Sequence, residues 1–109
     1  MRQFEIRWAA LPEPVGPRPV LLLSRTAAYQ YLTKVIVAEV TTTKRAISQE
    51  VNLGRREGVP HPCVANLDNI HVVAKEALGK RIGVVAPNRW REVKRALGHA
   101  LDWLELKAL

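Results

Sequence analysis

The chain has 109 residues, a net charge of +7 and a hydrophobic content of 48%. This length fits one compact domain, expected over residues 1–109, and leaves no room for a second. The hydrophobic content excludes a disordered chain, and the apolar runs are far shorter than the roughly 20 residues that cross a bilayer. The first residues mix charges with apolar side chains and lack a signal-peptide core, so we expect a cytoplasmic protein.

The charge favours an anionic partner. Lys and Arg number 17 against 10 Asp and Glu, and clustered cations attract polyphosphates and release their counterions. A basic balance also occurs on surfaces that are merely solvated, so charge alone indicates nucleic acid without specifying it. Cys63 is the only cysteine, which excludes an intrachain disulfide.

Strands dominate the first half of the chain. Alternating apolar residues predict a strand over residues 4–10. Four prolines in residues 11–19 predict a stiff, extended loop, because proline fixes φ and removes a backbone donor. Apolar or β-branched runs predict strands over residues 20–24 and 34–41, and alternation predicts another over residues 49–53. Residues 54–62 are rich in glycine and proline, and we expect a loop there.

The second half begins with short strands and ends in a helix. Strands are expected over residues 63–67, 69–73 and 81–86, with one or two helical turns over residues 74–78 that Gly79 ends. Pro87 suits the first turn of a terminal helix. The apolar stripe of this helix mainly faces the core in our interpretation and comprises Trp90, Val93, Leu97, Leu101 and Leu104. Gly98 costs about 1 kcal/mol relative to alanine within a helix, so we expect close packing there.

These elements predict a β-rich α+β domain, a small barrel with a C-terminal helix. Within it, Arg18 lies between Pro17 and Pro19, which restrict the backbone that presents its guanidinium. A guanidinium binds phosphate oxygens through paired hydrogen bonds and keeps its charge at physiological pH. From spacing alone, an ordinary surface arginine before a strand is the simpler interpretation.

Two further polar clusters could contribute chemistry. The segment 41–45 places three threonines, a lysine and an arginine at a strand end, where they could hold a phosphodiester or simply be solvated. The segment 68–71 brings Asp68, Asn69 and His71 together, and on a strand Asn69 and His71 share a face while Asp68 points away unless the chain bends. Proton transfer needs hydrogen-bond reach of the reacting hydroxyl, and an Asp-Asn pair is equally a common turn.

The sequence contains no metal-binding motif. His61 and Cys63 are poorly spaced for zinc, and no second pair of ligands accompanies them. A phosphate-binding glycine loop, a Gly-x-Ser-x-Gly turn and a metalloprotease helix are also absent. We therefore expect neither a metal nor another cofactor.

Five segments in order carry a family resemblance: residues 6–8, 14–23, 37–42, 63–70 and 78–83. Together they resemble the MazF/PemK toxins of type II toxin–antitoxin systems, over nearly the whole chain. The resemblance implies an SH3-like barrel that forms a homodimer and cleaves single-stranded RNA at short sequence motifs without a metal. It also implies a cognate antitoxin whose acidic, disordered tail occupies the RNA groove.

The same resemblance assigns residue roles. The family's catalytic arginine matches Arg18 and its catalytic threonine matches Thr41. An aspartate proposed as active in some members matches Asp68, although the arginine that those members carry two positions earlier is Asn66 here. The loop before Arg18 is shorter than in many members, so the cut-site sequence does not carry over. Residues expected to bind RNA are Thr42, Lys44, Arg45, Asn69 and His71.

The expected chemistry uses the nucleophile that RNA itself carries, the 2′-hydroxyl. The enzyme must hold this group in line, assist proton transfers and stabilise the charged phosphorane. Arg18 would stabilise that charge and is a candidate to protonate the leaving 5′ oxygen, and Thr41 would hold a phosphate oxygen. The products would be a 2′,3′-cyclic phosphate and a 5′-hydroxyl, and DNA should survive. The sequence does not identify the general base.

Two alternatives remain open. A non-enzymatic toxin of the same fold that poisons DNA gyrase would rely on residues of the terminal helix, whereas the match at Arg18 and Thr41 favours cleavage. A basic barrel that binds RNA without cutting it usually interleaves aromatic and basic residues, and only 6% of this chain is aromatic. Trp8 and Trp90 are, moreover, expected in the core.

Overall fold

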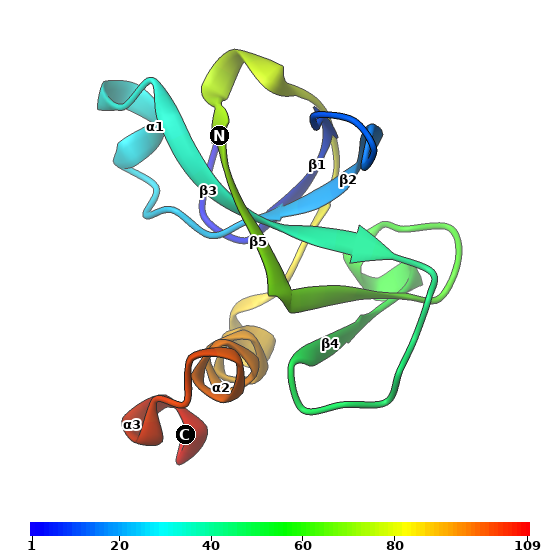
Figure 1. Ribbon diagram of the computed structural model, residues 1–109, viewed down its shortest axis with the longest axis vertical. Coiled ribbons are helices and arrows are strands. Elements are labelled where there is room, and N and C mark those ends of the chain that lie inside the picture. Colours follow the sequence, from blue (N-terminus) through cyan, green and yellow to red (C-terminus); the bar gives the residue numbers. More distant parts are fainter.

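The computed structural model describes residues 1–109 and shows one six-stranded antiparallel sheet with helices around it (Figure 1). The strands are β1 (Glu5–Ala10), β2 (Pro17–Leu22), β3 (Lys34–Thr41), β4 (Glu50–Leu53), β5 (Cys63–Ala74) and β6 (Leu78–Val84). The α-helices are α1 (Ala28–Tyr31), α2 (Trp90–Leu101) and α3 (Leu104–Lys107), and the 3-10 turns are η1 (Arg55–Glu57), η2 (Lys75–Ala77) and η3 (Pro87–Arg89).

The sheet is bent but not closed, with strand order β4-β5-β3-β2-β1-β6. The edge strands β4 and β6 share no hydrogen-bonded ladder, so the predicted barrel is an open one. Close packing of η1 on β6 brings the edges together instead. A Cβ on Gly83 would lie 1.6 Å from the Glu57 carbonyl oxygen, so only glycine permits this approach. The predicted fold class, a β-rich α+β domain with a C-terminal helix, is confirmed.

Both faces of the central strands are covered by apolar side chains. One core cluster contains Ile6, Leu21 and Ala38, and α2 adds Val93 and Ala96 to it. The opposite face carries a second cluster: Ala9, Leu11, Val20, Leu22, Tyr29, Val35, Val37 and Val73. Successive residues of a strand point to opposite faces, so burial of both faces explains the unbroken apolar run in β2.

Most strands lie where the sequence predicts them, with three differences. β2 begins at Pro17 instead of residue 20, because Pro17 and Pro19 take places in the ladder with β1. The two strands expected on either side of Asp68 are one strand, β5. Its residues 67–69 form a bulge without partners in β3 and bend the strand. Gly79 does not end a helix, because the turn η2 is followed directly by β6, which includes Gly79.

The terminal helix is shorter than its apolar stripe suggests. Asp102 adopts a left-handed conformation with φ 51° and ends α2 at Leu101. The chain then folds back, and a Cβ on Gly98 would lie 2.7 Å from the Leu106 Cβ of α3. The close packing predicted at Gly98 is thereby confirmed. Leu101 and Leu104, by contrast, are 56% and 70% exposed, so the distal part of the stripe is not core.

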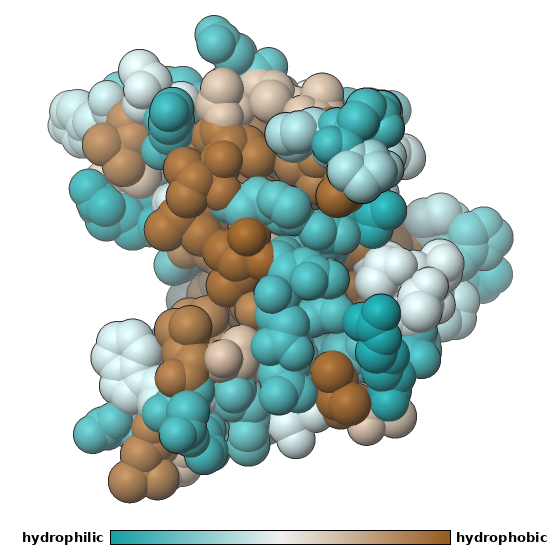
Figure 2. Space-filling model, viewed as in Figure 1, coloured by the Kyte–Doolittle hydropathy of each residue, from teal (hydrophilic) through white to brown (hydrophobic).

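Exposed apolar side chains gather along one side of the molecule (Figure 2). Ile36 and Val72 lie directly opposite each other in the β3–β5 ladder, and both are exposed. We call these two residues, together with Leu101 and Leu104, the apolar side surface. None of the helices has both the length and the apolar character needed to cross a bilayer.

Candidate active site

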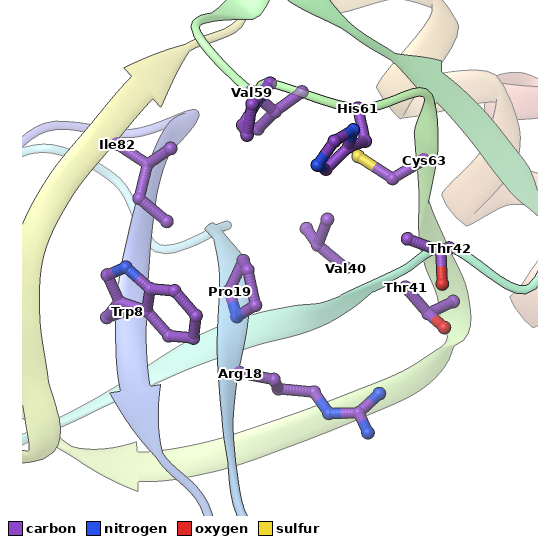
Figure 3. A pocket seen from close by; sticks show the side chains of 11 residues that line it. Trp8, Arg18, Pro19, Val40, Thr41, Thr42, Val59, His61, Cys63 and Ile82 are labelled. Carbon is purple, nitrogen blue, oxygen red and sulfur yellow. The ribbon is translucent and has the colours of Figure 1, made fainter.

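Arg18 and Thr41 line the same pocket, which has a volume of about 500 Å³ (Figure 3). Arg18 belongs to β2 and Thr41 ends β3, and these two strands are neighbours in the sheet. The remaining residues of the lining are Trp8, Pro19, Val40, Thr42, Val59, Pro60, His61, Cys63 and Ile82. The sheet therefore joins two of the residues predicted to be catalytic at one concave site.

The pocket has a polar end and an apolar wall. In Figure 3 the Arg18 guanidinium and the Thr41 hydroxyl lie at one end, and Val59 and Ile82 lie at the other. Trp8 is 47% exposed and lines the pocket, so its expected place in the core is wrong. Such a pocket can hold a charged phosphodiester beside an aromatic or aliphatic surface suited to a nucleobase.

Trp90, by contrast, is partly integrated into the core. Its ring packs 5.4 Å from the Phe4 ring, centroid to centroid, and its indole N–H donates a hydrogen bond of 3.0 Å to the Val85 carbonyl. It is nonetheless 37% exposed. The core role expected from the sequence therefore holds for one face of this side chain.

Glu39 is a charged side chain inside β3 and is only 8% exposed. Its Oε1 accepts a hydrogen bond of 3.1 Å from Arg18 Nη1, and its Oε2 lies 2.5 Å from His71 Nε2. A buried carboxylate is strongly unfavourable unless cations and donors compensate for lost hydration. Glu39 thus contacts both Arg18 and His71, which the sequence suggested separately as site residues.

The guanidinium of Arg18 retains unused hydrogen-bonding capacity. Its Nε is buried and has no partner within the chain, and only Nη1 contacts Glu39. Because guanidinium presents five N–H donors in a planar fork, donors remain for an anion entering the pocket. A phosphate oxygen is an acceptor of suitable charge and geometry.

The threonines at the end of β3 differ in their surroundings. Thr41 is partly buried, and its hydroxyl accepts a hydrogen bond of 3.2 Å from the Thr43 N–H. Thr42 is exposed and also lines the pocket. Lys44 and Arg45 lie in the exposed β3–β4 loop outside the pocket lining, and Glu50 holds this loop by accepting the Arg45 N–H. Both cations can thus contribute long-range attraction to a polyanion without shaping the pocket.

Asp68 and Asn69 lie on the bulge of β5. Both are exposed, and neither lines the pocket. Buried Asn66 fixes the bulge, because its Oδ1 accepts a hydrogen bond of 2.9 Å from the Asp68 N–H. Asn66 therefore has a structural role in this chain, and the fold does not place Asp68 in contact with Arg18 or Thr41.

Cys63 contributes to the wall of the pocket and is 5% exposed. Burial raises the pKa of its thiol, which disfavours the nucleophilic thiolate. Groups of three or more His, Cys, Asp or Glu side chains arranged to bind a metal ion are not found.

Three residues of this region escaped sequence reasoning about function: Trp8, Glu39 and His61. A useful signal was available for Glu39, because a carboxylate in the middle of a β-branched, apolar run must find partners if the strand is buried. His61 was considered only as a metal ligand, but it is exposed and faces the pocket. No spacing rule would have found it, since a loop presents it.

Comparisons with known proteins agree with this arrangement. Residues 2–101 match the family described as the PemK-like, MazF-like toxin of type II toxin–antitoxin systems. The chain is 38% identical over 98 residues to the probable endoribonuclease MazF2 of Mycobacterium tuberculosis, an alignment that covers 89% of this chain and 94% of the relative. It is 36% identical over 89 residues to the endoribonuclease MazF3 of the same organism, covering 80% and 86%.

Solved structures show the same fold. The Mycobacterium tuberculosis toxin MazF-mt6 superposes with a TM-score of 0.84 and 34% identity, covering 90% of this chain and 96% of that one. A mycobacterial endoribonuclease in complex with its cognate antitoxin superposes with a TM-score of 0.82 and 27% identity, covering 94% and 96%. The match extends over almost the entire chain and includes every strand of the sheet, so the protein belongs to the PemK/MazF family of type II toxin–antitoxin toxins.

Proposed function

We propose that this protein is the toxin of a type II toxin–antitoxin pair and acts as an endoribonuclease on single-stranded RNA. Relatives that match most of its length are described as endoribonucleases. The single observation that carries the proposal is the convergence of Arg18 and Thr41 on one pocket, with guanidinium donors left unpaired by the chain. The net charge of +7 supports an RNA substrate.

The proposed reaction needs only the RNA and protein side chains. Arg18 binds the non-bridging oxygens of the scissile phosphate and stabilises the negative charge of the phosphorane. Thr41 donates its hydroxyl to a phosphate oxygen, and Thr42 borders the same space. The 2′-oxygen displaces the 5′-oxygen, leaving a 2′,3′-cyclic phosphate and a 5′-hydroxyl. Lys44, Arg45 and the exposed Asn69 are suited to contacts with the flanking backbone.

A cognate antitoxin with an acidic, disordered tail is the proposed protein partner, met in the cytoplasm. A mycobacterial relative is described in complex with its cognate antitoxin. An acidic tail would complement the basic chain and compete with RNA for the cations beside the pocket. The antitoxin would thus inhibit cleavage by occupying the RNA-binding site. The tail would order on binding and thereby cover a large area.

A homodimer through the apolar side surface is also part of the proposal. Val72 is 66% exposed and Ile36, opposite it, is 44% exposed, although both occupy the middle of a regular ladder. Leu104 extends the exposed apolar area onto α3 at 70% exposure. Exposed apolar residues gathered on one side of a chain are typical of an interaction surface, and a second copy would cover them symmetrically.

The test is incubation of purified protein with a long single-stranded RNA in EDTA, followed by mapping of the ends. Discrete cuts with 5′-hydroxyl ends that a kinase can label are expected from the wild type, and Arg18→Ala should lose them. A DNA strand of the same sequence should stay intact. Intact RNA at high protein excess would refute the proposed activity and would make gyrase inhibition the next function to measure.

A further inference from the structure

The structure leaves one catalytic role to be filled, the acceptor of the 2′-hydroxyl proton. We propose that His71 is this general base and that Glu39 is the positioning residue that orients it, with Arg18 as the second partner of Glu39. This inference rests on the proposed ribonuclease function. It changes the role of His71 from a general RNA contact to a defined proton acceptor.

The first step of the argument is the charge of Glu39. Its side chain is 11% exposed, and each carboxylate oxygen has a cationic or donor partner, Arg18 on Oε1 and His71 on Oε2. The adjacent guanidinium stabilises the ionised carboxylate, which can only accept hydrogen bonds. His71 must therefore carry its proton on Nε2, the nitrogen 2.5 Å from Oε2.

The second step concerns the other ring nitrogen. With Nε2 protonated in the neutral imidazole, Nδ1 carries the lone pair and accepts a proton. Nδ1 makes no hydrogen bond within the chain, and it is not among the buried unpaired atoms, which are only Arg18 Nε and Tyr29 Oη. The basic nitrogen is therefore open to solvent or substrate. A carboxylate that fixes the tautomer of a catalytic histidine acts in this way in other enzymes.

The third step is placement on the sheet. Glu39 and Thr41 are two residues apart in β3 and so share a face. His71 pairs with Val37, which lies on the same face as Glu39. Val20 pairs with Glu39, and Arg18 lies two residues before Val20 in β2 and so shares its face. These residues therefore share one face of the sheet. His71 lies outside the lining of the pocket and adjoins it through the contacts of Glu39 with both His71 and Arg18. The bulge of β5 contributes to this, because it sets which β5 residue faces Val37.

Two competing bases fit the geometry less well. Glu39 itself is nearly inaccessible and uses both oxygens for internal partners. His61 is exposed at the pocket, but no side chain holds its imidazole, whereas a general base must be fixed within hydrogen-bond reach of its proton. His71 is the histidine whose tautomer and orientation the chain itself determines.

The proton balance of the step is complete. The 2′-hydroxyl gives its proton to His71 Nδ1 while the 2′-oxygen forms a bond to phosphorus and the P–O5′ bond breaks. Guanidinium does not release a proton in proteins, so in this step Arg18 stabilises charge and is not the acid that the resemblance suggested. The departing 5′-oxygen takes a proton from water. The resulting hydroxide removes the proton from the His71 imidazolium, and the enzyme returns to its starting state.

The experiment uses a short RNA that contains a cut site mapped with the wild-type protein. His71→Gln keeps an N–H near the Nε2 position to satisfy Glu39 but has no basic nitrogen. Its single-turnover rate should fall on the order of 100-fold or more, and the decline in rate at acid pH that a histidine base predicts for the wild type should be absent. Its affinity for the same RNA with a 2′-deoxy nucleotide at the cut should match wild type. His99→Gln, in α2, is the matched control and should cleave normally.

Glu39→Gln tests the positioning role. Its amide can donate to Nε2 and thereby shift the imidazole proton to Nδ1, so the rate should fall while His71 remains present. A third substrate, in which sulfur replaces the scissile 5′-oxygen, separates base from acid because sulfur leaves without a proton. His71→Gln should remain slow on this RNA.

Each outcome has a defined meaning. If the wild type cuts but His71→Gln cuts equally fast with an unchanged pH profile, the inference is overturned while the ribonuclease function stands. Recovery of His71→Gln on the sulfur-containing RNA would make His71 the acid and also overturn it. A severe loss in His61→Gln with normal cleavage by His71→Gln would move the base to the pocket wall. Absence of cutting by the wild type would refute the proposed function itself.

Discussion

The guanidinium of Arg18 and the carboxylate of Glu39 meet across β2 and β3 at 3.1 Å, so the residue assigned to phosphate binding also compensates a buried charge. In the proposed mechanism, catalysis and stability therefore depend on the same side chain. A loss of activity in an Arg18 variant is informative only when the two contributions are separated.

Arg18→Ala should lower the single-turnover cleavage rate on the order of 100-fold to 1,000-fold, as expected for loss of a charge-stabilising donor. It should also lower the free energy of unfolding by about 1–3 kcal/mol, because one oxygen of Glu39 loses its partner. The double variant Arg18→Ala/Glu39→Gln removes the uncompensated charge. Urea melts should show that it regains stability, while cleavage remains lost. Recovered stability with recovered cleavage would contradict the assignment of Arg18.

Gly98→Ala should detach α3 from α2. Alanine stabilises a helix interior by about 1 kcal/mol relative to glycine, but its Cβ would lie 2.7 Å from both the Leu106 Cβ and the Lys107 backbone nitrogen. The overlap is relieved if the short α3 moves away, so global stability should change little. Hydrogen exchange of the amides in residues 104–109 should become faster than in the wild type. Unchanged protection of these amides would show that α2 and α3 tolerate the methyl group together.

Glu5→Gln should reduce the dependence of stability on pH in the acid range. Burial alone raises the pKa of Glu5, but hydrogen bonds from the Arg2 N–H and the Arg7 side chain outweigh it and hold the pKa below its ordinary value of 4.5. Stability from the ionised carboxylate is therefore present above the ordinary pKa and is lost as pH falls through the lower folded-state pKa.

The measurement is the free energy of unfolding in urea between about pH 6 and pH 3. The wild type should lose more stability than Glu5→Gln over this interval, and the two curves should converge at the acid end. Parallel curves would mean that Glu5 does not contribute to the acid sensitivity.

Val72→Glu should weaken self-association. The residue is 66% exposed in the single chain and belongs to the apolar side surface. A carboxylate there would be desolvated in a symmetric dimer, twice per interface, at a cost of several kcal/mol. Sedimentation equilibrium should show a dimer for the wild type and a larger dissociation constant for the variant. Lys80→Gln, at an exposed position in β6, lowers the net charge by the same amount as Val72→Glu and controls for that change.

Periodicity was sufficient to predict most of the fold. Alternation located β1 and β4 because one residue in two is buried on a half-covered strand, and a β-branched run located β3. Gly98 revealed close packing because glycine is costly in a helix. The bulge in β5 was not predictable, since it depends on the Asn66 side chain accepting the Asp68 N–H. The end of α2 was not predictable either. It depends on the left-handed backbone of Asp102, and an aspartate in the sequence does not by itself indicate that conformation.

The candidate site was predictable only in part from the sequence. Arg18 and Thr41 came from the family resemblance, and the pairing of β2 with β3 explains why they share a pocket. Asp68 and His71 were close in sequence but expected on opposite faces unless the chain bends, and the bulge leaves Asp68 exposed while His71 reaches Glu39. That contact joins residues from β3 and β5, and only the register of the ladder brings them within reach.

The pairing of β3 with β5 also has a consequence for how the chain folds. Its register runs from Thr41–Val64 at one end to Lys34–Ala74 at the other, so the whole β4 region must be looped out before the ladder forms. Closing such a loop loses entropy before any contact compensates for it. We therefore expect docking of β5 to limit the folding rate, with substitutions in this ladder slowing refolding and those in α3 mainly accelerating unfolding.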